Sequence, residues 1–226
     1  MADKSKIWYL ENFNLFSSFS MKEMEEMSRM TAMRSCQKNQ VIFFEDDPSD
    51  KIYFLKEGKV KLSRFAEDGR EIIVAILGPG ELFGELAISG QEKRVETAAA
   101  IEPSVVCILN AREMEMMMEK NPRFNLRITK LIGLKLQKIE NRLAALVFKT
   151  SEQRIGSFIY DSAMEYGKET PEGIELVLRL THDDIAKLTA TARPTVSTFF
   201  NELEKGDIIQ YNRKRILIRD LQRLPR

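Results

Sequence analysis

Residues that build metal and redox sites are scarce in this sequence of 226 residues. It contains two cysteines, Cys36 and Cys107, and a single histidine, His182. With one histidine, the usual zinc sites and a Ser-His-Asp triad are hard to assemble. Two cysteines cannot form a disulfide framework, so we expect a reducing, cytoplasmic location. We interpret both cysteines as small buried hydrophobic residues, with a redox switch as the alternative.

Long apolar runs and an excess of charge are also missing. No run of about 18 apolar residues is present, and the N-terminus lacks the basic-then-apolar pattern of a signal peptide, so we expect no membrane partner. The formal net charge is +1. The chain as a whole is therefore not a polybasic nucleic-acid binder, and any contact with nucleic acid must come from a local patch.

What the first half does contain is a series of short apolar segments separated by turns rich in glycine and aspartate. Such a series is typical of an antiparallel barrel or sandwich, although the sequence does not predict the strand order. The expected strands are residues 41–44, 52–55, 60–62, 72–76, 97–100 and 105–109.

The chain then becomes helical. Asn121-Pro122 starts a long helix, expected over about 122–148, because proline suits the first helical position. This helix carries an apolar row with the 4-3-4-3 spacing of a two-stranded coiled coil, which predicts a homodimer. The alternative is that the row packs on the chain's own barrel. The row consists of Ile132, Leu136, Ile139, Leu143 and Leu146.

The capping box Ser20-Met21-Lys22-Glu23 predicts a short helix over about 21–31, and Asn110 with Glu113 starts another. A further capping box, Thr150-Ser151-Glu152-Gln153, restarts a helix just beyond the long one. We therefore place a domain boundary here. The expected domains are 1–148, which includes the long helix, and 149–226.

The second domain shows the pattern of a helix-turn-helix. Thr181 is expected to cap a short helix, and a turn of three to four residues leads to a second helix that begins at Arg193-Pro194. A hairpin with a cationic tip follows, which we interpret as a wing. From Arg193 to Arg226 there are eight Lys/Arg and four Asp/Glu, an excess of 8 − 4 = +4. We expect this region to bind double-stranded DNA.

The expected DNA contacts lie on the second helix and the hairpin. Arg193 can reach the O6 and N7 atoms of guanine, and the remaining polar residues suit phosphates or base edges. The full set is Arg193, Thr195, Ser197, Thr198, Asn201, Arg213, Lys214 and Arg215.

No combination of residues indicates catalysis. The one candidate charged pair, Arg94 with Glu85, has no nucleophile, base or metal set beside it, so we expect no enzymatic activity. His182 lies at a helix start, where we interpret it as a capping or phosphate-contacting residue.

Four stretches, in this order, resemble the Crp/Fnr family of bacterial transcription regulators: the glycine-punctuated barrel, Phe83-Gly84-Glu85-Leu86-Ala87 followed by Arg94, the long helix, and Leu180 to Ala186 followed by Arg193 to Ser197. The resemblance implies an α+β fold with an N-terminal antiparallel β-roll of jelly-roll type, a long dimerisation helix and a C-terminal winged helix-turn-helix. It also implies a homodimer on pseudo-palindromic DNA, and RNA polymerase as a partner if the protein activates.

The resemblance further implies a cyclic AMP pocket, in which Glu85 meets the ribose hydroxyl and Arg94 the cyclic phosphate. The family's phosphate-binding serine or threonine is Val95 here, and the positions that meet adenine are Ile139 and Glu140. Each lost charge-assisted hydrogen bond costs roughly 1.5–3 kcal/mol. We therefore expect an effector other than cyclic AMP, with cyclic AMP in an atypical pocket as the alternative. The pocket candidates are Gly84, Glu85, Leu86, Arg94, Val95, Ile139 and Glu140.

Other interpretations stay open at this level. Glu85 and Arg94 can instead pair with each other. The four cysteines of an iron–sulfur cluster are absent from one chain. The methionines at 114 and 116–118 are more typical of core packing than of haem ligation. A ligand-binding module that acts on a protein partner is the alternative function.

The recognition segment departs from the family in two places. Pro194 replaces a glutamate that reads cytosine, so we expect a half-site different from the common one. Ala190 replaces a turn glycine, which we expect to suit a helical or near-helical turn.

Overall fold

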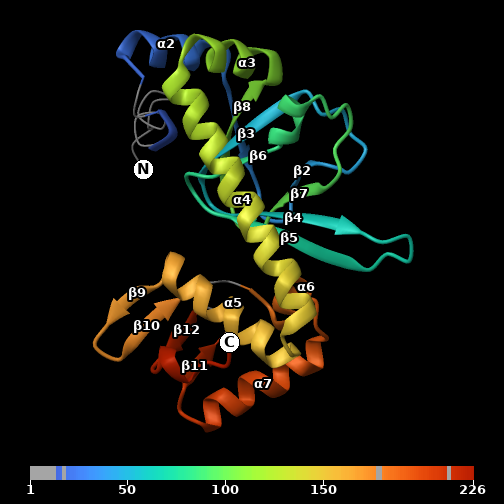
Figure 1. Cartoon of the computed structure of the whole chain (residues 1–226), viewed down its shortest axis with the longest axis vertical. Helices are drawn as coiled ribbons and strands as arrows, with labels where there is room; N and C mark the ends of the chain where they lie inside the picture. The colour runs from blue at the N-terminus through green and yellow to red at the C-terminus, as the bar shows by residue number, and fades with distance from the viewer. Residues whose placement is uncertain (1–13, 17–18, 177–179, 213–214) are drawn as a thin grey trace. The chain divides into compact units, whose positions relative to one another are not determined.

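The computed structural model describes residues 14–16, 19–176, 180–212 and 215–226 (Figure 1). The chain forms two compact units, Met1–Lys135 and Leu136–Arg226, and helix α4 (Pro122–Phe148) contributes to both. Among the described residues, no helix combines the length and the apolar character needed to cross a membrane.

The first unit contains two antiparallel four-stranded sheets, with strand orders β1-β8-β3-β6 and β2-β7-β4-β5. The six expected strands are all present, and the sequence missed β1 and β6. The first sheet consists of β1 (Ala32–Cys36), β8 (Ser104–Asn110), β3 (Lys51–Glu57) and β6 (Leu82–Phe83). The second consists of β2 (Val41–Phe43), β7 (Thr97–Ala100), β4 (Val60–Phe65) and β5 (Glu71–Leu77).

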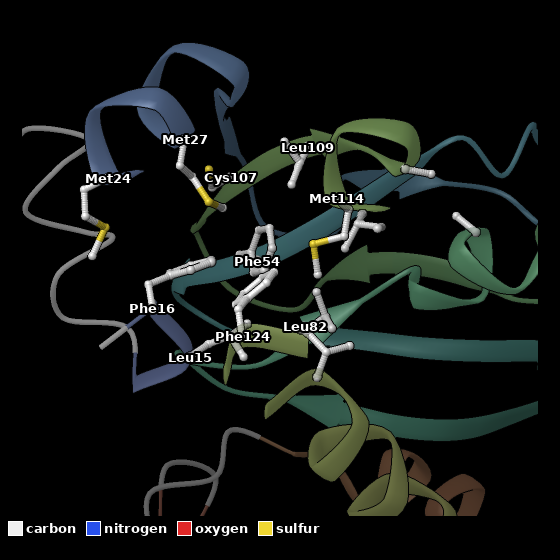
Figure 2. Packing of buried hydrophobic residues seen from close by; sticks show 14 residues of the cluster. Leu15, Phe16, Met24, Met27, Phe54, Leu82, Cys107, Leu109, Met114 and Phe124 are labelled. Atoms are coloured by element: carbon white, nitrogen blue, oxygen red, sulfur yellow. The ribbon is translucent and has the colours of Figure 1, made fainter. Parts of the chain in front are cut away.

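Three helical segments pack against this roll: α2 (Met21–Met30), α3 (Ala111–Lys120) and the start of α4. Figure 2 shows the core between them, where Phe16, Phe54 and Phe124 converge. The ring of Phe16 lies 5.2 Å from that of Phe54 and 5.6 Å from that of Phe124. Capping boxes at Ser20 and Asn110 start α2 and α3. The shared aromatic core therefore holds the beginning of α4 on the roll.

Both cysteines are buried and unbridged, as predicted. Cys107 belongs to the core in Figure 2, and burial raises the pKa of the Cys36 thiol. A thiol held in its protonated form is a poor nucleophile, so this environment does not favour a redox role.

The second unit combines three helices with a small antiparallel sheet of order β11-β12-β10-β9. Its helices are α5 (Ser151–Tyr166), α6 (His182–Thr189) and α7 (Arg193–Lys205). Its strands are β9 (Lys168–Thr170), β10 (Gly173–Leu176), β11 (Ile209–Asn212) and β12 (Arg215–Ile218). The sequence also predicts a polar turn over 169–173 and a short strand over 175–180. The turn comprises only residues 171–172, because Lys168–Thr170 pairs with β10. Residues 177–179 of the predicted strand lie outside the described part.

Candidate functional site

The guanidinium of Arg94 is buried and held by the main chain. Nη1 donates to the carbonyl of Gly84 at 3.2 Å and Nη2 to that of Lys51 at 2.5 Å. The group also lies 4.5 Å from the centre of the Phe43 ring and 5.5 Å from that of Tyr53. Desolvation lowers the pKa of Arg94. Arg94, the residue predicted to bind a phosphate, therefore already has hydrogen-bond acceptors and aromatic partners within the roll.

Gly84 has to be glycine for two reasons. Its φ of 73° lies in the left-handed region, and a Cβ at this position would sit 2.7 Å from Nη1 of Arg94. Gly84 thus makes space for the guanidinium of the arginine ten residues later.

Glu85 does not pair with Arg94, which was the alternative left open by the sequence. Its carboxylate instead binds Lys135 of α4, with 2.8 Å between Nζ and Oε1. The same ammonium donates to the carbonyl of Leu82 at 2.6 Å. Less than a third of either side chain is exposed. The long helix itself thus neutralises the carboxylate predicted to bind ribose.

The cavity beside Arg94 measures about 10 Å³, which is room for about one water molecule. Four predicted pocket residues line it, together with Glu96. Burial, and then the nearby Glu85, raise the pKa of Glu96, whereas Lys135 and Arg94 lower it. Small-molecule sites are typically about 300–1,000 Å³. The lining residues are Phe43, Ser49, Gly84, Leu86, Lys93, Arg94, Val95 and Glu96.

Replacing Lys135 by methionine should lower the free energy of unfolding by about 2 kcal/mol. The change leaves Glu85 and the Leu82 carbonyl without the ammonium, and hydrogen bonds to charged groups each contribute about 1.5–3 kcal/mol. Urea denaturation of both proteins measures the difference. The control is Lys130→Met, which removes an exposed cation of the same helix. Equal stabilities of the two variants would contradict a structural role for the ion pair.

The apolar row predicted to form the dimer lies exposed on α4. The exposed fraction is 63% for Leu143, and the other members range from 43% to 56%. This exposure argues against packing of the row on the chain's own barrel. Ile139 and Glu140, two of the predicted pocket residues, are exposed in the second unit as well. By contrast, Ile128, about two helical turns before the end of the first unit, is fully buried.

The helix-turn-helix is built as predicted. Thr181 caps α6 in a capping box with Asp184, whose carboxylate accepts from the Thr181 amide at 2.9 Å. Pro194 starts α7. The turn differs from the expectation: Ala190 has φ 50° and ψ 50°, a left-handed conformation and not a near-helical one. Such a residue carries a strain of roughly 1–2 kcal/mol that glycine would avoid.

His182 packs under the recognition helix and is not a cap. Its ring is stacked 4.9 Å from Tyr211 of the wing and lies 5.0 Å from Phe200 of α7. Nδ1 is 2.9 Å from Oγ of Ser197, which donates in turn to the carbonyl of Arg193. Nε2 is buried. Burial, and then the Arg193 charge, lower the pKa of His182, which favours the neutral ring. Nothing local in the sequence indicates this contact.

The predicted DNA-contacting side chains differ in their exposure. Arg193, Thr198 and Asn201 are exposed on α7, whereas Thr195 and Ser197 are half-buried. In the wing, Arg215 is ion-paired with Glu175 at 3.1 Å. Arg213 and Lys214 lie outside the described residues.

Within the described ranges, no group of three or more His, Cys, Asp or Glu side chains could hold a metal ion. The site is thus a winged helix-turn-helix joined by a long helix to a β-roll that has a small cavity beside Arg94. This combination defines a class of transcription regulators.

Comparisons with known proteins agree with this class. Residues 33–121 match the cyclic nucleotide-binding domain family and residues 153–226 the Crp-like helix-turn-helix domain family. The global nitrogen regulator of Synechocystis sp. is 30% identical over 80% of this chain and 81% of its own length. The CRP-like cAMP-activated global transcriptional regulator of Mycobacterium tuberculosis is 28% identical over 84% of each chain.

Solved structures share the fold. A CooA mutant from Carboxydothermus hydrogenoformans superposes with a TM-score of 0.78 at 24% identity, covering 93% of this chain and 92% of its own. A transcriptional regulator of the CRP/FNR family from Thermus thermophilus gives 0.70 at 23% identity, covering 85% and 96%. The chain belongs to the Crp/Fnr family of transcription regulators.

Proposed function

We propose that the protein is a homodimeric, sequence-specific DNA-binding regulator whose effector is not cyclic AMP. The observation that carries the dimer is the exposed aliphatic row on α4, which has coiled-coil spacing and includes Leu143 at 63% exposure. Exposed Arg193, Thr198 and Asn201 on α7 support base and phosphate contacts. Residues 1–148 form the effector domain in this proposal and residues 149–226 the DNA-binding domain.

The pocket supports the exclusion of cyclic AMP. The cavity has a volume of about 10 Å³ and is lined by the carboxylate of Glu96. Arg94 is bonded to two carbonyls, and Glu85 to Lys135. A cyclic nucleotide would have to enlarge the cavity, break the Glu85–Lys135 ion pair and place its phosphate near the negatively charged Glu96. Val95 offers it no hydroxyl donor.

The mechanism we propose is a shift between two populations. A change at the roll alters the paired helices along Ile132 to Leu146, and the DNA-binding domains reorient about residues 148–150. Both recognition helices then face DNA about 34 Å apart, one turn of the duplex. The protein acts in the cytoplasm, where bacterial DNA lies, and contacts RNA polymerase if it activates.

Selection from random DNA duplexes tests this function. We expect the purified protein to enrich a palindrome equally with and without cyclic AMP. The matched variant Arg193→Ala should lose preference at one base pair in each half-site, a discrimination of about 1–3 kcal/mol. A palindrome recovered only with cyclic AMP would support the nucleotide-responsive alternative. Failure to enrich any sequence, with or without it, would favour a module that acts on a protein partner.

A further inference from the structure

Two arginines from different helices meet at the C-terminal end of α6. Nη2 of Arg142, on α4, donates to the carbonyl of Leu188. Nε and Nη2 of Arg154, on α5, donate to the next two carbonyls, those of Thr189 at 2.9 Å and Ala190 at 3.0 Å. Three consecutive carbonyls are therefore bound by side chains that come from outside the helix-turn-helix.

These carbonyls lie where the main chain needs outside donors. The last four carbonyls of a helix have no partner within the helix, and cations at this end are favourable. The chain then leaves α6 through the left-handed Ala190 and starts α7 at Arg193. Because only residues 190–192 separate the two helices, the position of the Leu188–Ala190 carbonyls sets where the recognition helix begins.

Arg142 differs from Arg154 in its place on the chain. It immediately precedes Leu143 on α4, so its backbone belongs to the helix that carries the exposed aliphatic row. The residue as a whole is exposed, and desolvation of the guanidinium where it meets α6 lowers the pKa of Arg142. A displacement or rotation of α4 at Leu143 is therefore passed to the α6–α7 turn through one side chain.

We propose that Arg142 is a positioning residue, which couples the pairing of the α4 helices to the placement of α7 without touching DNA. The inference rests on the proposed function, since it requires a dimer that binds a palindrome. It assigns a part in DNA binding to a residue that lies outside both the recognition helix and the wing.

The test compares full-length Arg142→Gln with the parent protein on the selected palindrome and on a scrambled duplex, at several salt concentrations. We expect affinity for the palindrome to fall about 10-fold, within the 5- to 150-fold range of typical couplings. Affinity for the scrambled duplex, the dimer mass and the salt slope should not change. The slope counts phosphate contacts, and losing one would reduce it by about 0.9.

Two further variants keep the test decisive. Lys138→Gln removes a cation one turn earlier on α4, where it forms an exposed ion pair with Glu165, and should leave affinity for the palindrome unchanged. Arg142→Lys keeps the charge but lacks the planar set of guanidinium donors. Its affinity for the palindrome should lie between those of Arg142→Gln and the parent protein. It carries the test if Arg142→Gln does not fold.

Three results would overturn the proposal. Unchanged affinity of the Arg142 variants for the palindrome would exclude a positioning role. An equal loss on both duplexes with a smaller salt slope would make Arg142 a phosphate contact. A parent protein that selects no duplex would instead remove the proposed function, and this inference with it.

Discussion

Leu143→Glu should yield a monomer that binds the palindrome at least about 100-fold more weakly than the parent. Leu143 is 63% exposed in one chain and is the fourth of the five residues in the aliphatic row. In the proposed coiled coil the two copies would face each other, so the substitution would place two carboxylates together in an apolar seam. A monomer contacts one half-site and loses the gain from linked binding, which is typically 10²–10⁴-fold.

The matched control is Leu134→Glu on the same helix. Leu134 is 57% exposed, a fraction similar to that of Leu143. It lies two residues from Ile132 and from Leu136, and therefore on the side of α4 that faces away from the predicted seam. Sedimentation velocity and DNA titration should show a dimer with parental affinity for this variant. A Leu143→Glu protein that remains dimeric, or a monomer with full affinity for the palindrome, would contradict the proposed assembly.

Phe200→Ala should lower the stability of the second unit by about 3–5 kcal/mol and abolish specific DNA binding. Phe200 is 1% exposed, and its ring lies 5.0 Å from both His182 and Tyr211. Phe200, on α7, therefore packs against both α6 and the wing in the interior of the second unit. Truncating a buried phenylalanine removes its transfer free energy and leaves a cavity, which together give losses of this size.

Hydrogen exchange measures this loss of stability. The α6 and α7 amides report on the second unit, and the amides of the β-roll serve as the reference for the first unit. Thr198→Ala is the control, because Thr198 is exposed on the same helix. This variant should leave exchange unchanged and weaken only DNA binding. Protection in Phe200→Ala within about 1 kcal/mol of the parent would show that the aromatic cluster does not hold the unit together.

Features set by neighbouring residues were predictable from the sequence. Serine, threonine or asparagine followed by an acid or glutamine at the third helical position predicted the starts of α2, α3, α5 and α6, and each forms the expected capping box. The 4-3-4-3 row on α4 was equally readable. These signals depend on contacts within one turn of helix, so the sequence carries them in full.

Contacts between distant residues were not predictable in the same way. Glu85 binds Lys135, 50 residues later, and Arg142 binds the carbonyl of Leu188. The chain contains many carboxylates and carbonyls that could accept from a given lysine or arginine, and only the tertiary structure determines which of them lies within hydrogen-bond distance. The same holds for the stacking of His182 on Tyr211, because these residues are far apart in the sequence and no local pattern links them. The left-handed Ala190 escaped prediction because alanine normally avoids that conformation.

The way in which Arg94 is held changes how a common experiment must be interpreted. Because the family resemblance implies that Arg94 binds the phosphate of the effector, its replacement is the obvious way to test for loss of ligand binding. Here its guanidinium joins the carbonyls of Lys51 and Gly84 and covers the rings of Phe43 and Tyr53. Removing it would remove contacts to β3 of one sheet and β2 of the other. An inactive Arg94 variant would therefore report a damaged scaffold, and only a variant shown to be folded could report on signalling.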